Sequence, residues 1–479
     1  MVSQALHRAR FAHTSEVWPL LSPSFAPDGV LLGTKRFLLR KRFVTVRKSK
    51  KRPELGNVLI VAPTGSGKGI LAVSQLLTWQ HSVIVNDIKG DLFTQTAGFR
   101  SLLGPVYVLD PTGVGHAYDP LQGKVTEDAL YASAAHLLHQ AEGPDIFTQR
   151  ATMMLACLFE AAMREGVAAL PYARAMLRTG PLVCAERLQT ISSELATRLL
   201  DVALEHANPN DRFLLSAWGT LTARMHPLLT ETVIRSLAHS DFTPEQIITS
   251  DRPVTIYMRW PEQNLEALAP LVRLLWGSLI GEMQTAHDQR KGGGCQPVML
   301  LIDEAGRTAI PSLAEHATTI RSRGLIMWLA VQSLSQLEVV YGKARAQVLR
   351  DNMESQLYYR PADVVTAEYI ERRCGRRSGY AHHSTEQQNG QASEGRSEQS
   401  IPLLSTQDFM HYGDHEVIGF HRALPPFKLE RMDWRQHLIL QKRRTVPPPQ
   451  LPALPDSVGL PVMQELNPSH YIDPDRLRE

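Results

Sequence analysis

The sequence predicts an α/β protein in which a mostly parallel sheet is flanked by helices and an all-α domain is inserted. Three observations support this fold class. Short apolar runs alternate with longer amphipathic stretches, which is typical of a parallel sheet covered on both faces. The segment 125–250 contains no comparable run. A glycine-rich loop also follows the first of these apolar runs, and the 479 residues are enough for two to four domains.

Seven apolar runs are expected to form the strands of the sheet. Each is rich in valine, isoleucine, leucine or aromatic residues and ends at a polar or glycine-rich corner. Strands that alternate with helical stretches favour an α/β architecture with parallel pairing. The predicted strands are Asn57–Val61, Ser82–Ile88, Val106–Asp110, Val254–Trp260, Val298–Glu304, Leu325–Val331 and Gln356–Arg360.

The remaining regions differ from this sheet in composition. Residues 125–250 are rich in alanine and leucine at helical spacing, which predicts a helical domain between the third and fourth strands. Segment 376–400 is polar and poor in hydrophobic residues, so we expect a mobile loop. From Val446 the chain turns proline-rich, which predicts an extended tail. The predicted divisions are 1–56 (basic segment), 57–124 and 251–437 (two parts of the sheet domain), 125–250 (all-α domain) and 438–479 (tail).

Bulk composition excludes several classes of protein. The net charge of +3, from 51 basic and 48 acidic residues, indicates no particular partner. The four cysteines form no C-x-x-C pair, which argues against a zinc site or a disulfide framework and fits a reducing compartment. No secretory signal is evident, and no uncharged apolar run approaches the roughly 18 to 20 residues of a spanning helix. We therefore expect a chain without transmembrane segments.

The stretch "VLIVAPTGSGKGILA", Val58 to Ala72, resembles the phosphate-loop pattern G-x-x-x-x-G-K-[ST]. It departs from the pattern twice, because Ala62 replaces the first glycine and Gly69 replaces the final hydroxyl residue. Ala62 is a mild change, since that position mainly needs a small residue at a tight turn. Gly69 removes one magnesium ligand, which water, Thr64, Ser66 or Asp303 could replace.

The loop lies after an apolar strand and before a helix-compatible stretch, where a phosphate site requires it. Gly65 and Gly67 permit backbone conformations that bring consecutive N–H groups toward phosphate oxygens at a helix N-terminus. Lys68 would reach the β and γ phosphates of ATP. The predicted nucleotide-binding residues are Thr64, Gly65, Ser66, Gly67, Lys68 and Gly69.

Two further strand ends supply the groups that hydrolysis needs. "PVMLLIDEAGR" places Asp303 and Glu304 directly after an apolar strand. Asp303 is the expected Mg2+ ligand and Glu304 the general base that activates water. Gln332 follows the Leu325–Val331 strand, and it could reach the γ phosphate if that strand lies beside the Asp303 strand.

Taken together, these motifs resemble the TraG-type coupling proteins of bacterial type IV secretion and conjugation. The matching stretches are "APTGSGKG", "LLTWQHSVIVNDIKGDLF", "AYDPL", "LLIDEAGR", "TIRSRGLIMWLAVQSLSQLEVVYG" and "DNMESQLYY". The resemblance implies a RecA-like P-loop motor domain of a hexameric ATPase. It also implies delivery of DNA, often bound to a relaxase, or of effector proteins to a secretion channel at the inner membrane. Glycine after the loop lysine is common in this branch of the family.

The resemblance and the residues leave several alternatives open. Family members usually begin with transmembrane helices, so this chain is a soluble variant or fragment, or it reaches the cytoplasmic face of the inner membrane through a partner. The run Lys35–Arg52, with ten basic and no acidic residues, is either an edge hairpin or a contact for DNA or anionic lipid. Arg321 and Arg323 are either surface ion pairs, an arginine finger for a neighbouring subunit, or pore residues. A protein-effector coupling factor and a non-hydrolysing scaffold remain alternatives to the DNA motor.

Overall fold

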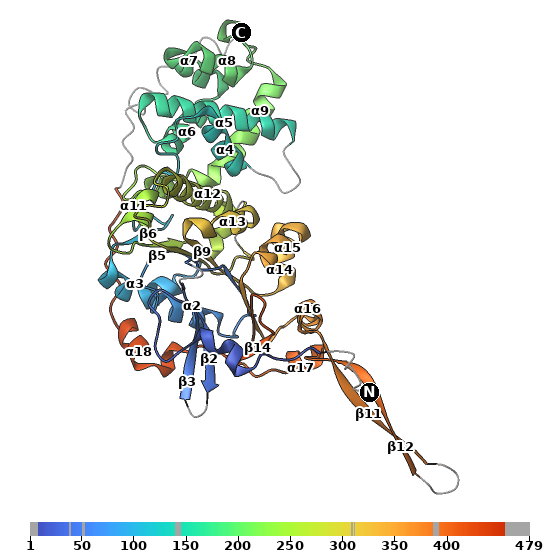
Figure 1. Cartoon of the computed structure of the whole chain (residues 1–479). Helices are drawn as coiled ribbons and strands as arrows, with labels where there is room; N and C mark the ends of the chain where they lie inside the picture. Colours follow the sequence, from blue (N-terminus) through green and yellow to red (C-terminus); the bar gives the residue numbers. More distant parts are fainter. Residues whose placement is uncertain are drawn as a thin grey trace.

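A large mixed sheet forms the centre of the molecule (Figure 1). The computed structural model describes residues 8–37, 40–49, 53–138, 145–307, 310, 312–386 and 392–455. Twelve strands follow the order β1-β3-β2-β14-β13-β10-β4-β9-β8-β5-β7-β6. An all-helical body covers one end of the sheet domain, and a two-stranded ribbon projects away from it in another direction (Figure 1).

The parallel half of the sheet consists of the seven predicted strands. Neighbours from β10 to β6 all pair in parallel, and the residues of these strands are almost entirely buried. Burial on both faces explains why they read as continuous apolar runs in the sequence. In sheet order they are β10 (Ser355–Tyr359), β4 (Val58–Val61), β9 (Leu325–Val331), β8 (Val298–Ile302), β5 (Ser82–Asp87), β7 (Thr255–Arg259) and β6 (Val106–Leu109).

The antiparallel half extends the sheet beyond β10 and was largely missing from the prediction. Strand β13 pairs with β10, and β14 then connects it to the N-terminal hairpin of β2 and β3. Most of the basic run Lys35–Arg52 lies on this hairpin near one end of the sheet, as the edge-hairpin interpretation predicts, while a contact with DNA or anionic lipid stays a prediction. These strands are β1 (Leu21–Ser22), β2 (Val30–Phe37), β3 (Arg40–Val46), β13 (Glu416–His421) and β14 (Phe427–Glu430).

Helices cover both faces of the sheet. Alternate residues of β4 belong to different core clusters: Val58 and Ile60 pack with α2 and α3, whereas Leu59 and Val61 pack with α12 and its neighbours. This alternation follows from the two-residue period of a strand. The helices of the sheet domain are α2 (Lys68–Leu76), α3 (Asp91–Leu103), α12 (Leu265–Gln289), α13 (Leu313–Thr319), α14 (Leu334–Tyr341), α15 (Lys343–Asp351) and α16 (Val364–Cys374), with short α1 (Thr14–Val17) and α17 (Thr406–Met410) at its margin.

The predicted helical insertion is present as a separate body above the sheet (Figure 1). The described residues between 125 and 250 contain helices and no strand. Two connections to the sheet domain are tied together, because Ala117 N donates to Asp241 Oδ2 at 2.8 Å and Asp241 N donates to Ala117 O at 3.0 Å. The helices are α4 (Glu127–Leu138), α5 (Ile146–Glu165), α6 (Ala169–Leu177), α7 (Pro181–Ile191), α8 (Ser193–Leu200), α9 (Arg212–Met225), α10 (Glu231–Arg235) and α11 (Pro244–Thr249).

Segment 376–400, predicted as a loop, instead contributes two long antiparallel strands, β11 (Arg376–Glu386) and β12 (Ala392–Pro402). Eleven residue pairs join them in register. An antiparallel ladder is held by backbone hydrogen bonds, so polar side chains do not prevent it. The polar composition was therefore a poor guide to the backbone at this place.

The start of the predicted tail is also more structured than its composition suggests. Residues Leu438–Arg444 form α18, which packs on α3. The chain then runs back along α3, where Gly98 permits close approach of the Val446 carbonyl. Gly115 N donates to Pro452 O at 2.8 Å, so the segment reaches the turn after β6. The part of the predicted tail beyond residue 455 lies outside the described residues.

Candidate functional site at the carboxyl ends of the strands

The predicted motifs come together because their strands are neighbours. Strands β4, β9 and β8 lie side by side and in parallel, so the segments that follow them share one edge of the sheet. The glycine-rich loop follows β4, Gln332 follows β9, and Asp303 with Glu304 follow β8. The condition attached to Gln332, that its strand lies beside the Asp303 strand, is therefore met.

The glycine-rich loop turns through two left-handed glycines. Gly65 has φ 81° and Gly67 has φ 96°, conformations that disfavour any side chain. Gly67 is the N-cap of α2, so the loop delivers its backbone to a helix N-terminus. Ala62 is fully buried, and its N–H donates to Val331 O at 2.9 Å. Ala62 thus extends the β4–β9 pairing, which explains why glycine is not needed there.

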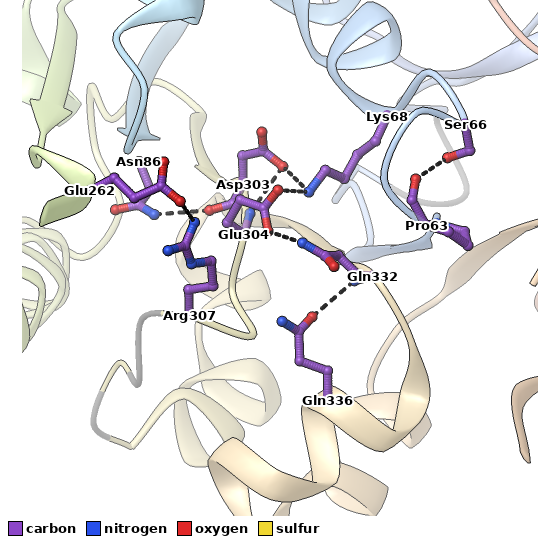
Figure 2. Close-up of polar contacts among 10 residues, drawn as sticks. All are labelled: Pro63, Ser66, Lys68, Asn86, Glu262, Asp303, Glu304, Arg307, Gln332 and Gln336. Atoms are coloured by element: carbon purple, nitrogen blue, oxygen red, sulfur yellow. Dashed lines mark hydrogen bonds and ion pairs between the residues drawn. The ribbon is translucent and has the colours of Figure 1, made fainter. Parts of the chain in front are cut away.

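Lys68 points across the loop to the two carboxylates after β8 (Figure 2). Its Nζ lies 2.6 Å from Glu304 Oε1 and 3.0 Å from Asp303 Oδ1. The lysine side chain is only 9% exposed, so these ion pairs lie in a partly dehydrated site. Such charge-assisted contacts are strong where solvent screening is weak.

The two carboxylates differ in their surroundings. Burial raises the pKa of Asp303 above its ordinary value, against the lowering effect of Lys68. Burial also acts to raise the pKa of Glu304, but Lys68 and the Gln332 hydrogen bond outweigh it and hold that pKa below its ordinary value. Glu304 is therefore the carboxylate kept ionised by its neighbours.

The Glu304 side chain is oriented by its backbone and by two neighbours. Its φ of 56° lies in the left-handed region, which is uncommon for a residue with a side chain. Its N–H donates to Asp303 Oδ1 at 3.0 Å, while Gln332 Nε2 donates to Glu304 Oε2 at 2.9 Å (Figure 2). The Gln332 N–H in turn donates to Gln336 Oε1 at 3.1 Å. Lys68 and Gln332 thus hold opposite oxygens of one carboxylate.

Arg321 and Arg323 do not belong to this site. They lie just before β9 begins, at the opposite edge of the sheet from the loop after β4. Arg323 pairs with Asp288 through Nε and Nη2 at 2.8 and 2.7 Å. Arg321 pairs with Glu54 at 3.1 Å and keeps a side chain that is 52% exposed. Either arginine could act on a site only in another copy of the chain.

Several residues near the loop carried no sequence signal. Arg431, in the segment after β14, donates from Nη1 to Ser66 O at 2.8 Å. Trp434 and Arg435 follow it and line the same pocket as the loop. Asp87, at the end of β5, also lines this pocket, and burial raises its pKa to about 6. The stretch "VNDIKGDLF" contributed to the resemblance, but Asp87 had no assigned role.

A pocket of about 420 Å³ joins these groups. It is lined by the loop, the first turns of α2 and α3, both carboxylates and the Trp434–Arg435 pair. Its size falls within the range of small-molecule sites. Thr64, Gly65, Gly67, Lys68 and Gly69 all line it, whereas Ser66 faces a neighbouring pocket.

The motifs on this edge agree with a comparison to known protein families. Residues 31–454 match the family model described as type IV secretory system conjugative DNA transfer. The chain belongs to this family. The match covers the sheet domain apart from α1, β1 and the first residue of β2, the inserted helices, and the segment that contains Arg431 and Trp434.

Curated members of the family are similar over much of the chain. Protein VirD4 of Rhizobium radiobacter is 26% identical over 430 residues, which covers 80% of this chain and 58% of the relative. The conjugal transfer protein TraG of Escherichia coli is 28% identical over 359 residues, covering 67% of this chain and 55% of the relative. The chain thus spans a little more than half the length of these relatives.

Solved structures confirm the fold. The bacterial conjugative coupling protein TrwB, in a form complexed with sulphate, has a TM-score of 0.67 at 16% identity, covering 90% of this chain and 95% of that one. TrwB in complex with the ATP analogue ADPNP has a TM-score of 0.65 at 16% identity, covering 96% and 98%. The predicted P-loop motor fold with an inserted helical domain is confirmed. Within the described residues, none of the helices has the length and apolarity that crossing a bilayer requires.

Proposed function

We propose that this chain is the motor part of a type IV coupling protein and hydrolyses ATP with Mg2+ at the glycine-rich loop. The observation that carries the proposal is Lys68, held between Asp303 and Glu304 at a helix N-terminus. The TrwB structures with ADP and Mg2+ and with ADPNP support it, because they share this fold. The family membership supports a role in conjugative transfer.

The residues present fit a magnesium nucleotide. A Cβ added at Gly65 or Gly69 would meet no atom within 4 Å, so space is open on the pocket side of the loop. Lys68 supplies a cation for the phosphates, and Asp303 supplies the hard oxygen that Mg2+ prefers. The Ser66 hydroxyl already donates to Pro63 O at 2.6 Å (Figure 2). Thr64 or water is therefore the better replacement for the hydroxyl that Gly69 lacks.

The lysine contact suggests how nucleotide binding prepares the base. Phosphate oxygens compete with Glu304 for Lys68, so binding releases one oxygen of the carboxylate toward water. Gln332 keeps its contact with the other oxygen and maintains the orientation of Glu304. Glu304 then accepts a proton from the attacking water. Mg2+, held through Asp303, would neutralise charge that develops on the phosphates.

We further propose that the transported substrate is DNA, bound to a relaxase, and that channel components at the cytoplasmic face of the inner membrane are its partners. The description of the matched family and the VirD4 and TraG relatives support this choice. The test is release of phosphate from ATP, with and without DNA, at two salt concentrations. Stimulation by DNA that weakens at high salt supports a DNA motor. A rate of ATP hydrolysis that DNA does not change, but that an effector signal peptide raises, would favour the effector alternative.

We propose a homo-hexamer by analogy with the family, with Arg321 as the residue that acts on a neighbouring copy. This half-exposed arginine lies at the sheet edge opposite the loop, where it can face the pocket of a neighbouring copy. Specific activity that rises with protein concentration, and that Arg321→Ala lowers, is the expected result. Specific activity independent of concentration would contradict a role for a second copy. Arg323→Ala serves as a control, because Asp288 holds that side chain through two contacts.

A further inference from the structure

We propose that Trp434 forms the subsite for the nucleotide base and gives the site a preference for purines over pyrimidines. This inference rests on the proposed nucleotide site and adds a specificity-determining residue from the C-terminal segment. Trp434 lines the same pocket as Lys68, Asp303 and Glu304. It begins the short helical turn Trp434–Gln436, which packs on α2.

The position of Trp434 follows from two contacts of Arg444. The Arg444 guanidinium carbon lies 4.6 Å from the centre of the Trp434 ring, and its Nε donates to Gln95 Oε1 at 3.3 Å. Gln95 lies about one turn into α3, beyond the helix start at Asp91. Val73 occupies a similar place in α2, and both residues line the pocket. The indole therefore stands one helical turn beyond the N-termini that face the phosphates.

The chemistry at this end of the pocket suits a flat, uncharged ring. Ile70, Val73 and Leu92 supply aliphatic contacts, and the half-buried indole adds an aromatic one. Asp303 and Glu304 line the pocket from the segment after β8, and Lys68 lines it from the first residue of α2. The other charged residues between β5 and α3, Asp87, Lys89 and Asp91, line it at or before the start of α3. A nucleotide combines a polyphosphate with an aromatic base, and the pocket offers a matching wall for each part. Arg444 lies over the indole ring, and this cation–π contact orients the ring.

Trp434 is held in place before any ligand binds. The preceding Asp433 accepts a hydrogen bond from Arg435 N at 3.0 Å and pairs with the Arg435 guanidinium through Oδ2 at 2.7 Å. Met432 and Leu440, on either side of this turn, are fully buried. The ring is thus attached to a firmly packed turn, which reduces the entropy lost on binding.

Stacking explains the expected selectivity. An aromatic ring attracts every base, and the attraction grows with the overlapping area, so purines bind better than pyrimidines. Stacking does not read the hydrogen-bonding edge of the base. We therefore expect ATP and GTP to bind with similar affinity and UTP to bind more weakly.

The test measures the binding of ATP, UTP and inorganic tripolyphosphate, each with Mg2+, to the full chain by calorimetry. Trp434→Ala is expected to weaken ATP binding about tenfold, to reduce the ATP to UTP ratio, and to leave tripolyphosphate binding unchanged. Trp434→Phe keeps an aromatic ring and should retain most of the affinity. Trp18→Ala is the matched control, since Trp18 is 55% exposed and lies outside the pocket.

Retained binding of tripolyphosphate shows that Trp434→Ala is folded at the loop. Equal affinities of Trp434→Ala and the unaltered chain for ATP would overturn the proposal. Equal losses for ATP and tripolyphosphate would also overturn it, because the tryptophan would then act on the loop and not on the base. If the unaltered chain binds neither compound, the proposed nucleotide function itself is wrong, and the inference falls with it.

Discussion

The pocket has two walls of different origin. The phosphate wall consists of the loop residues 64–69, of which all but Ser66 line the pocket, together with Asp303 and Glu304, and it is built from the ends of parallel strands. The C-terminal wall consists of residues 431–435, which follow the antiparallel strand β14 and of which Trp434 and Arg435 line the pocket. One hydrogen bond, from Arg431 to Ser66 O, joins the two walls across 365 residues of sequence. The phosphate wall carries the charged groups proposed for hydrolysis, Lys68, Asp303 and Glu304. The C-terminal wall supplies the Trp434 ring and the Arg431 hydrogen bond that supports the loop.

The two walls depend on the rest of the fold in different ways. Groups at parallel strand ends converge whenever the strands are neighbours, so the phosphate wall is a direct consequence of sheet order. The C-terminal wall exists only because β13 and β14 bring the chain back beside β2 and then over α2 and α3. Changes to the first wall should therefore lower the rate of hydrolysis most, and changes to the second should act on nucleotide affinity and on the order of the loop.

The largest effect is expected from Glu304→Gln in the phosphate wall. The amide cannot accept the proton of the attacking water, so turnover should fall about 10³-fold. ATP binding should persist, because Lys68 then loses a competing carboxylate. Phosphate release and calorimetry on the same sample measure the two quantities. A variant that hydrolyses ATP at the normal rate would remove Glu304 from the mechanism.

Lys68→Ala is expected to lower turnover about 10²-fold and to weaken ATP binding as well. Its side chain is the cation of the phosphate wall, and its removal leaves two neighbouring carboxylates unpaired. Lys68→Arg is a useful companion, since it keeps the charge with a different shape. Equal ATP affinity in Lys68→Ala and the unaltered chain would show that the nucleotide lies elsewhere.

The residues of the phosphate wall could be predicted from the sequence because the patterns that mark them lie in short stretches of chain. Lys68, Asp303 and Glu304 each follow an apolar run, and such runs are buried strands whose ends meet at one edge. The pairing of β8 with β9 brings Gln332 to Glu304, as its proposed reach to the γ phosphate requires. The catalytic and metal-binding roles of these residues stay predictions.

The C-terminal wall could not be predicted because its contacts are set by distant packing. Strands β13 and β14 form part of the sheet only through pairing with β10 and β2, which lie far away in the sequence. Arg431 resembles any surface arginine until β14 places it against the loop. The ribbon of β11 and β12 was missed for a related reason, since its ladder depends on backbone pairing and not on apolar side chains.

A smaller effect, on the free energy of unfolding, is expected from substitutions at two glycines of the loop. Gly67→Ala should lower the free energy of unfolding by about 1–2 kcal/mol, because its φ is 96° and the new Cβ would lie 2.5 Å from Arg431 Nη1. Gly69→Ala is the matched control. Gly69 lies within α2 with no atom within 4 Å of the new Cβ, so this change should raise the same free energy by about 0.5 kcal/mol. Chemical denaturation measures both, and equal effects would contradict the described loop.

Arg431→Ala tests the link between the walls. Loss of the hydrogen bond to Ser66 O should lower stability by about 1 kcal/mol and speed hydrogen exchange at the loop amides. It also removes the side chain that Gly67→Ala would strike, so the two changes should be less than additive in a double-mutant cycle. Strict additivity would mean that the walls act independently. Arg435→Ala is a control for the hydrogen exchange of the loop amides, because its guanidinium pairs with Asp433 and not with the loop.

The smallest effect is expected from Gly69→Ser, which restores the hydroxyl of the usual loop pattern. The new side chain has room, since no atom lies within 4 Å of its Cβ, and the helix should fold normally. The hydroxyl can take the place of a water as a magnesium ligand, so the Mg2+ concentration for half-maximal turnover should fall by less than about tenfold. Affinity for tripolyphosphate without Mg2+ should not change, because Lys68 and the backbone are untouched. A change in the affinity for tripolyphosphate alone would mean that Gly69 affects the shape of the phosphate wall and not the binding of Mg2+.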